Sequence, residues 1–179
     1  MKLTKRALVL LGLCACALVP LSAQTAQNRE LQRFWIHVDL GYGTANVSCD
    51  LCASGPRLGG VTYGVELGGT LNPNVRLGGA FEAWTHGTGS AAEDMENLGV
   101  VMYYYPTSSG LFVKGLVGLS TYHAAGFPAI SGTGWGATAG IGYEVPIGRS
   151  ATIIPFADYV LGNVGDLSYD DGTPFATGW

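Results

Sequence analysis

Two cysteines separated by two residues, Cys49 and Cys52, are the first candidates for chemistry in this chain. Such a pair can form a redox dithiol, contribute half of a zinc site or close a small disulfide loop. The redox motif needs a βαβ setting, the zinc site needs two more ligands, and haem attachment needs a histidine where the chain has Ala53. In an exported protein a Cys49–Cys52 disulfide is the expected state, with a free or intermolecular thiol as the alternative.

Two histidines have neighbours in the sequence that resemble parts of a hydrolase site. His86 precedes Ser90 and Glu93, and His123 follows Ser120. A hydrolase requires a nucleophile, a base and an acid in mutual contact. Neither group carries a recognisable motif, so we expect no catalytic residue, no bound metal and no cofactor.

Isolated charges lie on the small-residue side of several alternating segments. If the segments are strands of a barrel, these side chains share its lumen. They would form a packed plug, or a gate or narrow ion path that opens when a salt bridge breaks. We favour the plug, because an eight-stranded lumen is just wide enough for side chains to fill. We expect Lys114 to pair with Glu144. The predicted lumen residues are Asp39, Glu66, Arg76, Glu82, Lys114, Glu144 and Asp158.

Seven alternating segments of about ten residues must position these charges. In residues 61–71, for example, Val61, Tyr63 and Val65 alternate with small or polar residues. A strand turns successive side chains to opposite faces, so the pattern predicts an all-β chain. The predicted strands are 35–44, 61–71, 75–86, 97–105, 111–122, 133–145 and 152–161.

The connections between these segments alternate in length. Residues 72–74, 106–110 and 146–150 are short connections, whereas 45–59 and 87–96 are long, and 123–132 is fairly long. Short turns at one rim and long loops at the other are typical of an up-and-down antiparallel barrel in an outer membrane. We expect Pro155 to produce a bulge in the last strand, because proline lacks a ladder donor.

The N-terminus has the features of a secretion signal. Lys2, Lys5 and Arg6 precede an apolar run, and residues 21–23 form a cleavage-like site. We therefore predict a signal peptide over 1–23, a short periplasmic segment over 24–34 and one barrel domain over 35–179. Removal of the signal leaves 6 basic and 13 acidic residues, a net charge of −7. This charge argues against a nucleic-acid partner.

Alternation alone does not decide which face meets water, because a soluble barrel alternates as well. The export signal and a charged content of only 12% favour a barrel whose apolar face meets lipid. The cluster Tyr103–Tyr104–Tyr105 is expected to contribute to an aromatic girdle at the membrane interface. A soluble lipocalin-like ligand carrier is the weaker alternative.

The chain resembles the small bacterial outer-membrane barrels of the OmpA, OmpX and opacity-protein type. The resemblance rests on residues 35–43, 61–84 and 140–159, which include Gly140–Ile141–Gly142–Tyr143–Glu144. It implies an eight-stranded transmembrane barrel in the outer membrane, in contact with lipid and lipopolysaccharide and assembled by the barrel assembly machinery. Residues 162–179 have the composition of a loop, so we expect the eighth strand to lie outside this sequence.

The predicted function is a structural or surface-interaction role for a monomeric barrel. The alternative is a narrow porin for small solutes, which glycines on the lumen face would permit. Acidic residues in the long loops are expected to face the outside, where they could meet an extracellular ligand. These residues are Asp50, Glu93, Asp94, Glu96, Asp166, Asp170 and Asp171.

Overall fold

The computed structural model describes residues 34–46, 57–126, 128–147 and 151–176. Cys49 and Cys52 lie outside the described residues, as does the predicted signal peptide. No helix among the described residues is long and apolar enough to cross a membrane. The elements are β1 (Trp35–Ala45), β2 (Leu58–Asn72), β3 (Val75–His86), the 3-10 helix η2 (Gly89–Ala91), β4 (Glu93–Tyr104), β5 (Leu111–Ala124), β6 (Ile130–Tyr143), β7 (Val145–Ile147), β8 (Ala151–Ile153), β9 (Phe156–Asn163), β10 (Leu167–Tyr169) and β11 (Pro174–Ala176).

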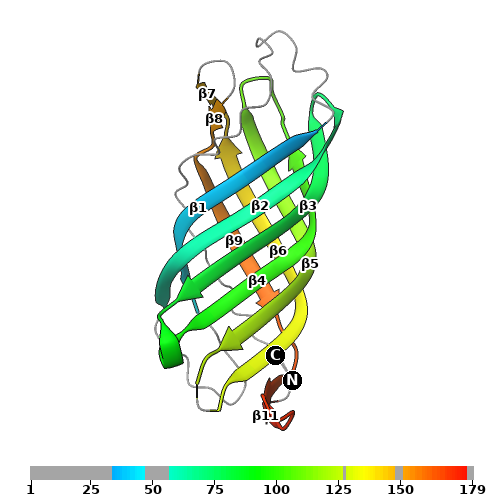
Figure 1. Cartoon of the computed structure of the whole chain (residues 1–179). Helices are drawn as coiled ribbons and strands as arrows, with labels where there is room; N and C mark the ends of the chain where they lie inside the picture. Colours follow the sequence, from blue (N-terminus) through cyan, green and yellow to red (C-terminus); the bar gives the residue numbers. More distant parts are fainter. Residues whose placement is uncertain (1–33, 47–56, 127, 148–150, 177–179) are drawn as a thin grey trace.

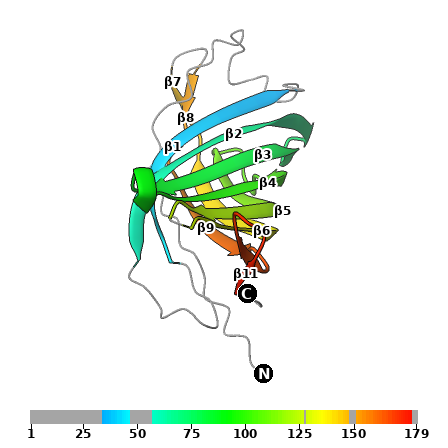
Figure 2. The ribbon, with the colours of Figure 1, turned by 60° about the horizontal axis from the view of Figure 1, so that its bottom comes forward.

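The long strands form one curled antiparallel sheet. β1 to β6 pair in chain order, and β9 pairs with β6. The curl encloses an interior between strands that lie on opposite sides in Figures 1 and 2. β10 pairs with the first residues of β6 and with β11. The predicted all-β antiparallel barrel architecture is confirmed.

The register places the short connections at one end of the sheet and the long ones at the other. The short-turn end holds the tight β2–β3 hairpin, where Asn74 N donates to Asn72 Oδ1 at 2.9 Å. The β7–β8 pair also lies there, whereas β11 lies at the opposite, long-loop end (Figure 1). Gly110, with a φ of 102°, closes the β4–β5 turn at the short-turn end.

Pro155 interrupts the last predicted strand instead of producing a bulge. The segment is divided into β8, which pairs with β7, and β9, which pairs with β6. Proline has no N–H to donate, but its carbonyl still accepts from Tyr143 N at 3.0 Å. With a break at Pro155, no ladder hydrogen bond needs the missing N–H, whereas a continuous strand would lack one donor there.

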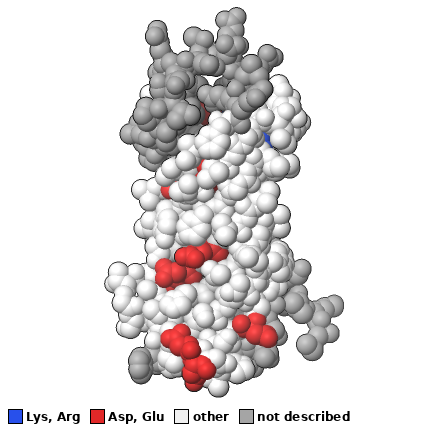
Figure 3. Space-filling model, turned by 45° about the vertical axis from the view of Figure 1, so that its right-hand side comes forward, with Lys and Arg blue, Asp and Glu red and all other residues white. Residues whose placement is uncertain are grey.

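The outer face of the sheet is apolar. Leu98 and Val117, near the middle of their strands, are 60% and 63% exposed, whereas Val101 on the inner face is fully buried. Figure 3 shows a mostly uncharged wall, with its larger acidic patches in the half of that view nearer the long-loop end. A water-soluble barrel has the opposite arrangement, so this exterior is suited to lipid. Other outward apolar residues include Val38, Leu40, Val61, Val65, Leu67, Val100, Met102, Val113, Leu119 and Ile141.

The predicted aromatic girdle at the end of β4 is wrong for two of its tyrosines. Tyr103 and Tyr105 are 3% and 5% exposed and face the interior, and only Tyr104 faces outward. The reason is the two-residue period of a strand, which gives Tyr103 and Tyr105 the same side as the buried Val101. These two rings belong to the filling of the lumen.

Candidate functional site

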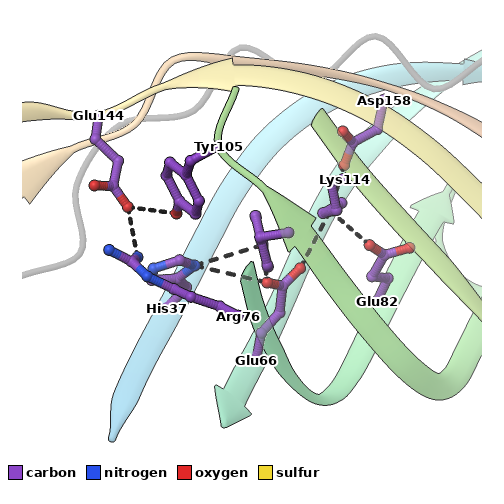
Figure 4. A network of polar contacts seen from close by, with 9 residues as sticks. His37, Glu66, Arg76, Glu82, Tyr105, Lys114, Glu144 and Asp158 are labelled. Carbon is purple, nitrogen blue, oxygen red and sulfur yellow. Dashed lines mark hydrogen bonds and ion pairs between the residues drawn. The ribbon is translucent and has the colours of Figure 1, made fainter. Parts of the chain in front are cut away.

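Lys114 lies at the centre of the lumen and is surrounded by carboxylates. Its Nζ is 3.1 Å from Glu66 Oε1, 2.8 Å from Glu82 Oε1 and 2.6 Å from Asp158 Oδ2. The partners come from β2, β3 and β9, so one side chain on β5 connects three strands that do not neighbour β5 in the sheet (Figure 4). Buried ion pairs of this kind persist only where their geometry compensates for the loss of water.

Hydrogen bonds to neutral side chains support two of these carboxylates. The Tyr103 hydroxyl donates to Glu66 Oε2, and His37 Nδ1 lies 3.7 Å from the same oxygen. Thr138 Oγ1 donates to Glu82 Oε2 at 2.7 Å. Glu66 and Glu82 are therefore held at both of their oxygens, which fixes their orientation.

A second ion pair lies toward the short-turn end. Arg76 Nη1 is 2.6 Å from Glu144 Oε1, and the Tyr105 hydroxyl donates to the same oxygen at 2.7 Å. The Arg76 guanidinium also lies 4.6 Å from the centre of the Tyr105 ring. This pair balances its own charge.

The predicted pairing of Lys114 with Glu144 is wrong. Lys114 is opposite Gly140 in the register of β5 and β6, and Glu144 follows the end of β6. The Lys114 side chain reaches Glu66 and Glu82 through the interior and Asp158 over Gly140, which lies between them in the strand register, and it does not turn toward Glu144 (Figure 4). Adjacency of strands does not determine pairing when a long side chain can cross a narrow lumen.

Asp39, on β1, is the remaining predicted lumen residue. It lines two cavities, each of about 30 Å³, and both cavities also include Phe156 and Asp158. Because one water needs roughly 10–15 Å³ of such space, each cavity has room for about two waters. We refer to Asp39, Glu66, Glu82, Lys114 and Asp158 as the charged layer.

An apolar cluster lies on each side of the charged layer. The short-turn cluster includes Tyr103 and Phe112, whose rings meet edge to face at 5.0 Å. The long-loop cluster includes Trp84, Met95 and Leu167. The full sets are Trp35, Ala80, Val101, Tyr103, Tyr105, Phe112 and Leu116 at the short-turn end, and Ala45, Trp84, Met95, Tyr122, Val160, Val164 and Leu167 at the long-loop end.

The structure also reveals polar residues that the sequence analysis did not identify. Asn97 and Ser120 are buried, and Asn97 Oδ1 and Ser120 Oγ have no hydrogen-bond partner among the described residues. The strand register places Glu82, Asn97 and Ser120 side by side on β3, β4 and β5. Asn97 and Ser120 are uncharged, and only the two-residue period of β4 and β5 could have indicated that they face inward.

Among the described residues, no hydrogen bond links His86 to Ser90 or Glu93, or His123 to Ser120. His86 Nδ1 lies 2.6 Å from the carbonyl oxygen of Gly59. Ser120 is completely buried inside the barrel, whereas His123 is exposed on the outer face, so the strand separates them. The described residues contain no cluster of three His, Cys, Asp or Glu side chains arranged to hold a metal ion.

The long-loop end is acidic. Glu96, Asp166, Asp170 and Asp171 are exposed there, and Glu93 accepts from the Tyr122 hydroxyl at 2.9 Å. In the β10–β11 turn, hydrogen bonds from Thr173 lower the pKa of Asp171, so this carboxylate stays ionised below the usual pH for aspartate. Asp50, the remaining predicted loop acid, lies outside the described residues.

Comparison with known proteins gives one family. No curated protein and no solved structure matches the chain. A family model described as an outer membrane protein beta-barrel domain matches residues 12–173. This match agrees with the curled antiparallel sheet, its apolar exterior and its charged interior. The chain belongs to the outer membrane protein beta-barrel domain family, and it is an outer-membrane barrel protein.

Proposed function

We propose that this outer-membrane barrel has a structural or surface-interaction role and that side chains close its lumen. The observation that carries the proposal is the position of the charged layer between two apolar clusters. Ions crossing such a lumen would have to displace close-packed aromatic and aliphatic side chains. Each cavity beside the charged layer, at about 30 Å³, has room only for waters or a very small ligand.

The ion pairs support a structural role because they connect strands that are not neighbours in the sheet. Lys114 joins β5 to β2, β3 and β9, and Arg76 joins β3 to Glu144 after β6. Hydrogen bonds from Tyr103 on β4 to Glu66 and from Thr138 on β6 to Glu82 add to these connections. We infer that the network fixes the cross-section of the barrel.

The acidic long-loop end supports a role at the cell surface. Long loops of outer-membrane barrels face the outside. With this orientation, Glu96, Asp166, Asp170 and Asp171 would face cations bound to lipopolysaccharide or a basic extracellular ligand. The proposal includes export by the signal peptide over residues 1–23, assembly by the barrel assembly machinery and a monomeric, non-catalytic barrel.

A narrow porin for small solutes is the second candidate. The observation that favours it is a row of glycines on the inner face of four neighbouring strands, Gly99, Gly118, Gly136 and Gly162, which are cross-strand neighbours. Glycine removes side-chain volume from the lumen at this level. The row lies beside the charged layer, so conduction would still require the apolar clusters to open.

Conductance distinguishes the two candidates. The mature protein is refolded in detergent micelles, its folding is verified by a compact gel band that disappears on heating, and it is then inserted into planar bilayers. A closed lumen predicts the compact band without steady single-channel conductance. Steady conductance by folded protein would overturn the closed lumen and support the porin. Protein that remains monomeric and folded without detergent would contradict both.

A further inference from the structure

The charged layer contains more carboxyl groups than positive charges. Asp39, Glu66, Glu82 and Asp158 supply four carboxyl groups around a single ammonium, that of Lys114. Arg76 is engaged by Glu144 and does not contribute to this balance. If all four acids are ionised and His37 carries a proton, the layer still has two uncompensated negative charges.

Asp39 is the carboxyl group of the layer without an ion pair. The other three lie within 3.1 Å of Lys114 Nζ, whereas Asp39 makes no hydrogen bond or ion pair within the described part of the chain. Asp39 is half-buried and lies over Gly64 on β2, where a Cβ would collide with its Oδ2. A carboxylate withdrawn from water without an opposite charge is neutralised by taking up a proton.

The groups around Asp39 also favour the neutral acid. Besides Asp39 itself, titratable side chains of β1, β2, β3, β4, β5 and β9 line the two cavities beside it. Lys114 brings the one permanent positive charge among these described side chains, and three other carboxylates already share it. The titratable lining residues are His37, Glu66, Tyr103, Lys114 and Asp158 in one cavity, and Tyr63, Glu82 and Asp158 in the other.

A buried oxygen without a donor lies beside the same acid. Asn97 is 3% exposed, it lines one of the two cavities together with Asp39, and its Oδ1 accepts no hydrogen bond among the described residues. An ionised carboxylate can only accept hydrogen bonds, whereas a protonated carboxyl group also donates one. A proton on Asp39 therefore adds a donor to a cavity that contains an unsatisfied acceptor.

We propose that Asp39 is a proton-binding site and that the folded barrel holds it as a neutral carboxylic acid at neutral pH. The proton removes one of the uncompensated charges and requires no additional volume. The cavity, at about 30 Å³, has room for a water that connects the Asp39 hydroxyl to Asn97 Oδ1. Glu66, Glu82 and Asp158 remain ionised around Lys114.

The inference goes beyond the closed barrel and does not depend on it. A neutral Asp39 is compatible with a plugged lumen and with a narrow porin. Conductance therefore tests the proposed function, whereas the pH dependence of stability tests the proton site.

The first experiment compares the stability of the refolded mature barrel with that of Asp39→Asn across a pH series. In the unfolded chain an aspartate is ionised above about pH 4, so a barrel that holds the proton binds it on folding and becomes less stable as pH rises. From about pH 5 to about pH 6, the folded-to-unfolded ratio should fall about tenfold more in the native chain than in Asp39→Asn. The readout is the fraction of the compact gel band across a urea series.

Asp39→Asn is the informative variant, because an asparagine has nearly the shape of a neutral aspartic acid and cannot ionise. It should fold and should be more stable than the native chain at alkaline pH. Glu96→Gln is the control, since Glu96 is exposed on the outer side of β4, and it should keep the pH dependence of the native chain. His37 is present in all three chains, so its own titration cancels in the comparison.

Infrared spectroscopy of the refolded barrel in the same pH range detects the proton directly. A neutral carboxylic acid has a carbonyl stretch that is separate from the bands of carboxylates. This stretch should be present in the native chain and in Glu96→Gln, and it should be missing in Asp39→Asn.

Four outcomes would overturn the proposal. Equal pH dependence in the native chain and Asp39→Asn, or a neutral-acid stretch that persists in Asp39→Asn, would show that any bound proton lies elsewhere. A native barrel without this stretch would show that all its acids are ionised. An Asp39→Asn chain that forms no compact band at any pH would show that folding requires the ionised carboxylate.

Discussion

Lys114 is the residue on which the interior of the barrel most depends. It is 9% exposed and is the only ammonium among three carboxylates that lie within 3.1 Å of it. Replacing the ion pairs together with apolar groups could be tolerated, but removing the lysine alone leaves its partners without a counter-charge. The effect of a substitution at Lys114 therefore depends more on the carboxylates that remain without a counter-charge than on the ion pairs that are lost.

Lys114→Ala should reduce the free energy of unfolding by about 3–5 kcal/mol, because it leaves buried carboxylates uncompensated. Thr62→Ala, at a half-buried lumen position with no ion pair, should cost much less. The measurement is the urea midpoint of the compact gel band after refolding in detergent. Equal midpoints for the two variants would contradict the role of Lys114.

Two glycines of β5 differ in how closely the neighbouring strand approaches them. A Cβ at Gly118 would collide with the carbonyl oxygen of Leu98 on β4, whereas a Cβ at Gly115 meets no atom within 4 Å. Both residues lie on β5, and successive odd and even positions of a strand face opposite sides. The same substitution therefore has different consequences three residues apart.

Gly118→Ala should destabilise the barrel by about 1–3 kcal/mol, because the β4–β5 pair must separate to accept the methyl group. Gly115→Ala, the control on the same strand, should have little effect. Thermal loss of β-sheet circular dichroism in micelles provides the measurement. If both variants had the same melting temperature, the close approach of Gly118 to β4 would be disproved.

At the scale of elements, β10 is the short strand that completes the long-loop cluster. Leu167 is 1% exposed and packs with Trp84, Met95 and Tyr122, although β10 has only three residues and follows a segment of loop composition. The pairing of β10 with β6, in which Ser168 lies opposite Ser131 and Tyr169 opposite Ile130, holds this strand in place. A three-residue strand contributes here through one buried side chain.

Leu167→Ala should cost about 2–5 kcal/mol, the range for removing a buried leucine side chain in a closely packed core. Ser168→Ala, in the same strand but half-buried, is the control and should cost little. The comparison uses urea midpoints, with bilayer conductance of Leu167→Ala as a second readout of whether the long-loop cluster seals the lumen. A midpoint unchanged by Leu167→Ala would show that β10 does not pack as described.

At the scale of the whole molecule, the barrel is defined by which face is apolar. The ion pairs of Lys114 lie in the interior, and the outer face is mainly apolar, apart from charges such as Glu96 near the long-loop end of β4. In water such an exterior would cause aggregation, whereas in lipid it is the favourable surface. An alternating sequence with its apolar side outward is therefore what an outer-membrane barrel requires.

A charge on the outer wall tests this orientation. Val117→Arg, near the middle of β5, should destabilise a barrel folded in lipid bilayers by about 2–4 kcal/mol, and Thr121→Arg, on the same face nearer the rim, by about 0–1 kcal/mol. Urea titration in phospholipid vesicles measures both. If Val117→Arg proved as mild as Thr121→Arg, this part of the wall would not face lipid.

The sequence alone determined the all-β class, the strand segments and the side on which each charge lies, because these follow from the two-residue period of a strand. The same period could have placed Tyr103 and Tyr105 inside with Val101, but their aromatic character suggested an interface. Pro155 indicated a disturbance in the last strand, although not whether it would be a bulge or a break.

Only the tertiary structure decided which charges meet. The partners of Lys114 lie on β2, β3 and β9, up to 48 residues away in sequence, and the curl of the sheet and the length of the lysine side chain select them over Glu144. The inward position of Leu167 likewise depends on β10 folding back onto β6. Local periodicity specifies the face of a residue, whereas its partner across the lumen depends on the radius and stagger of the barrel, which are properties of the whole sheet.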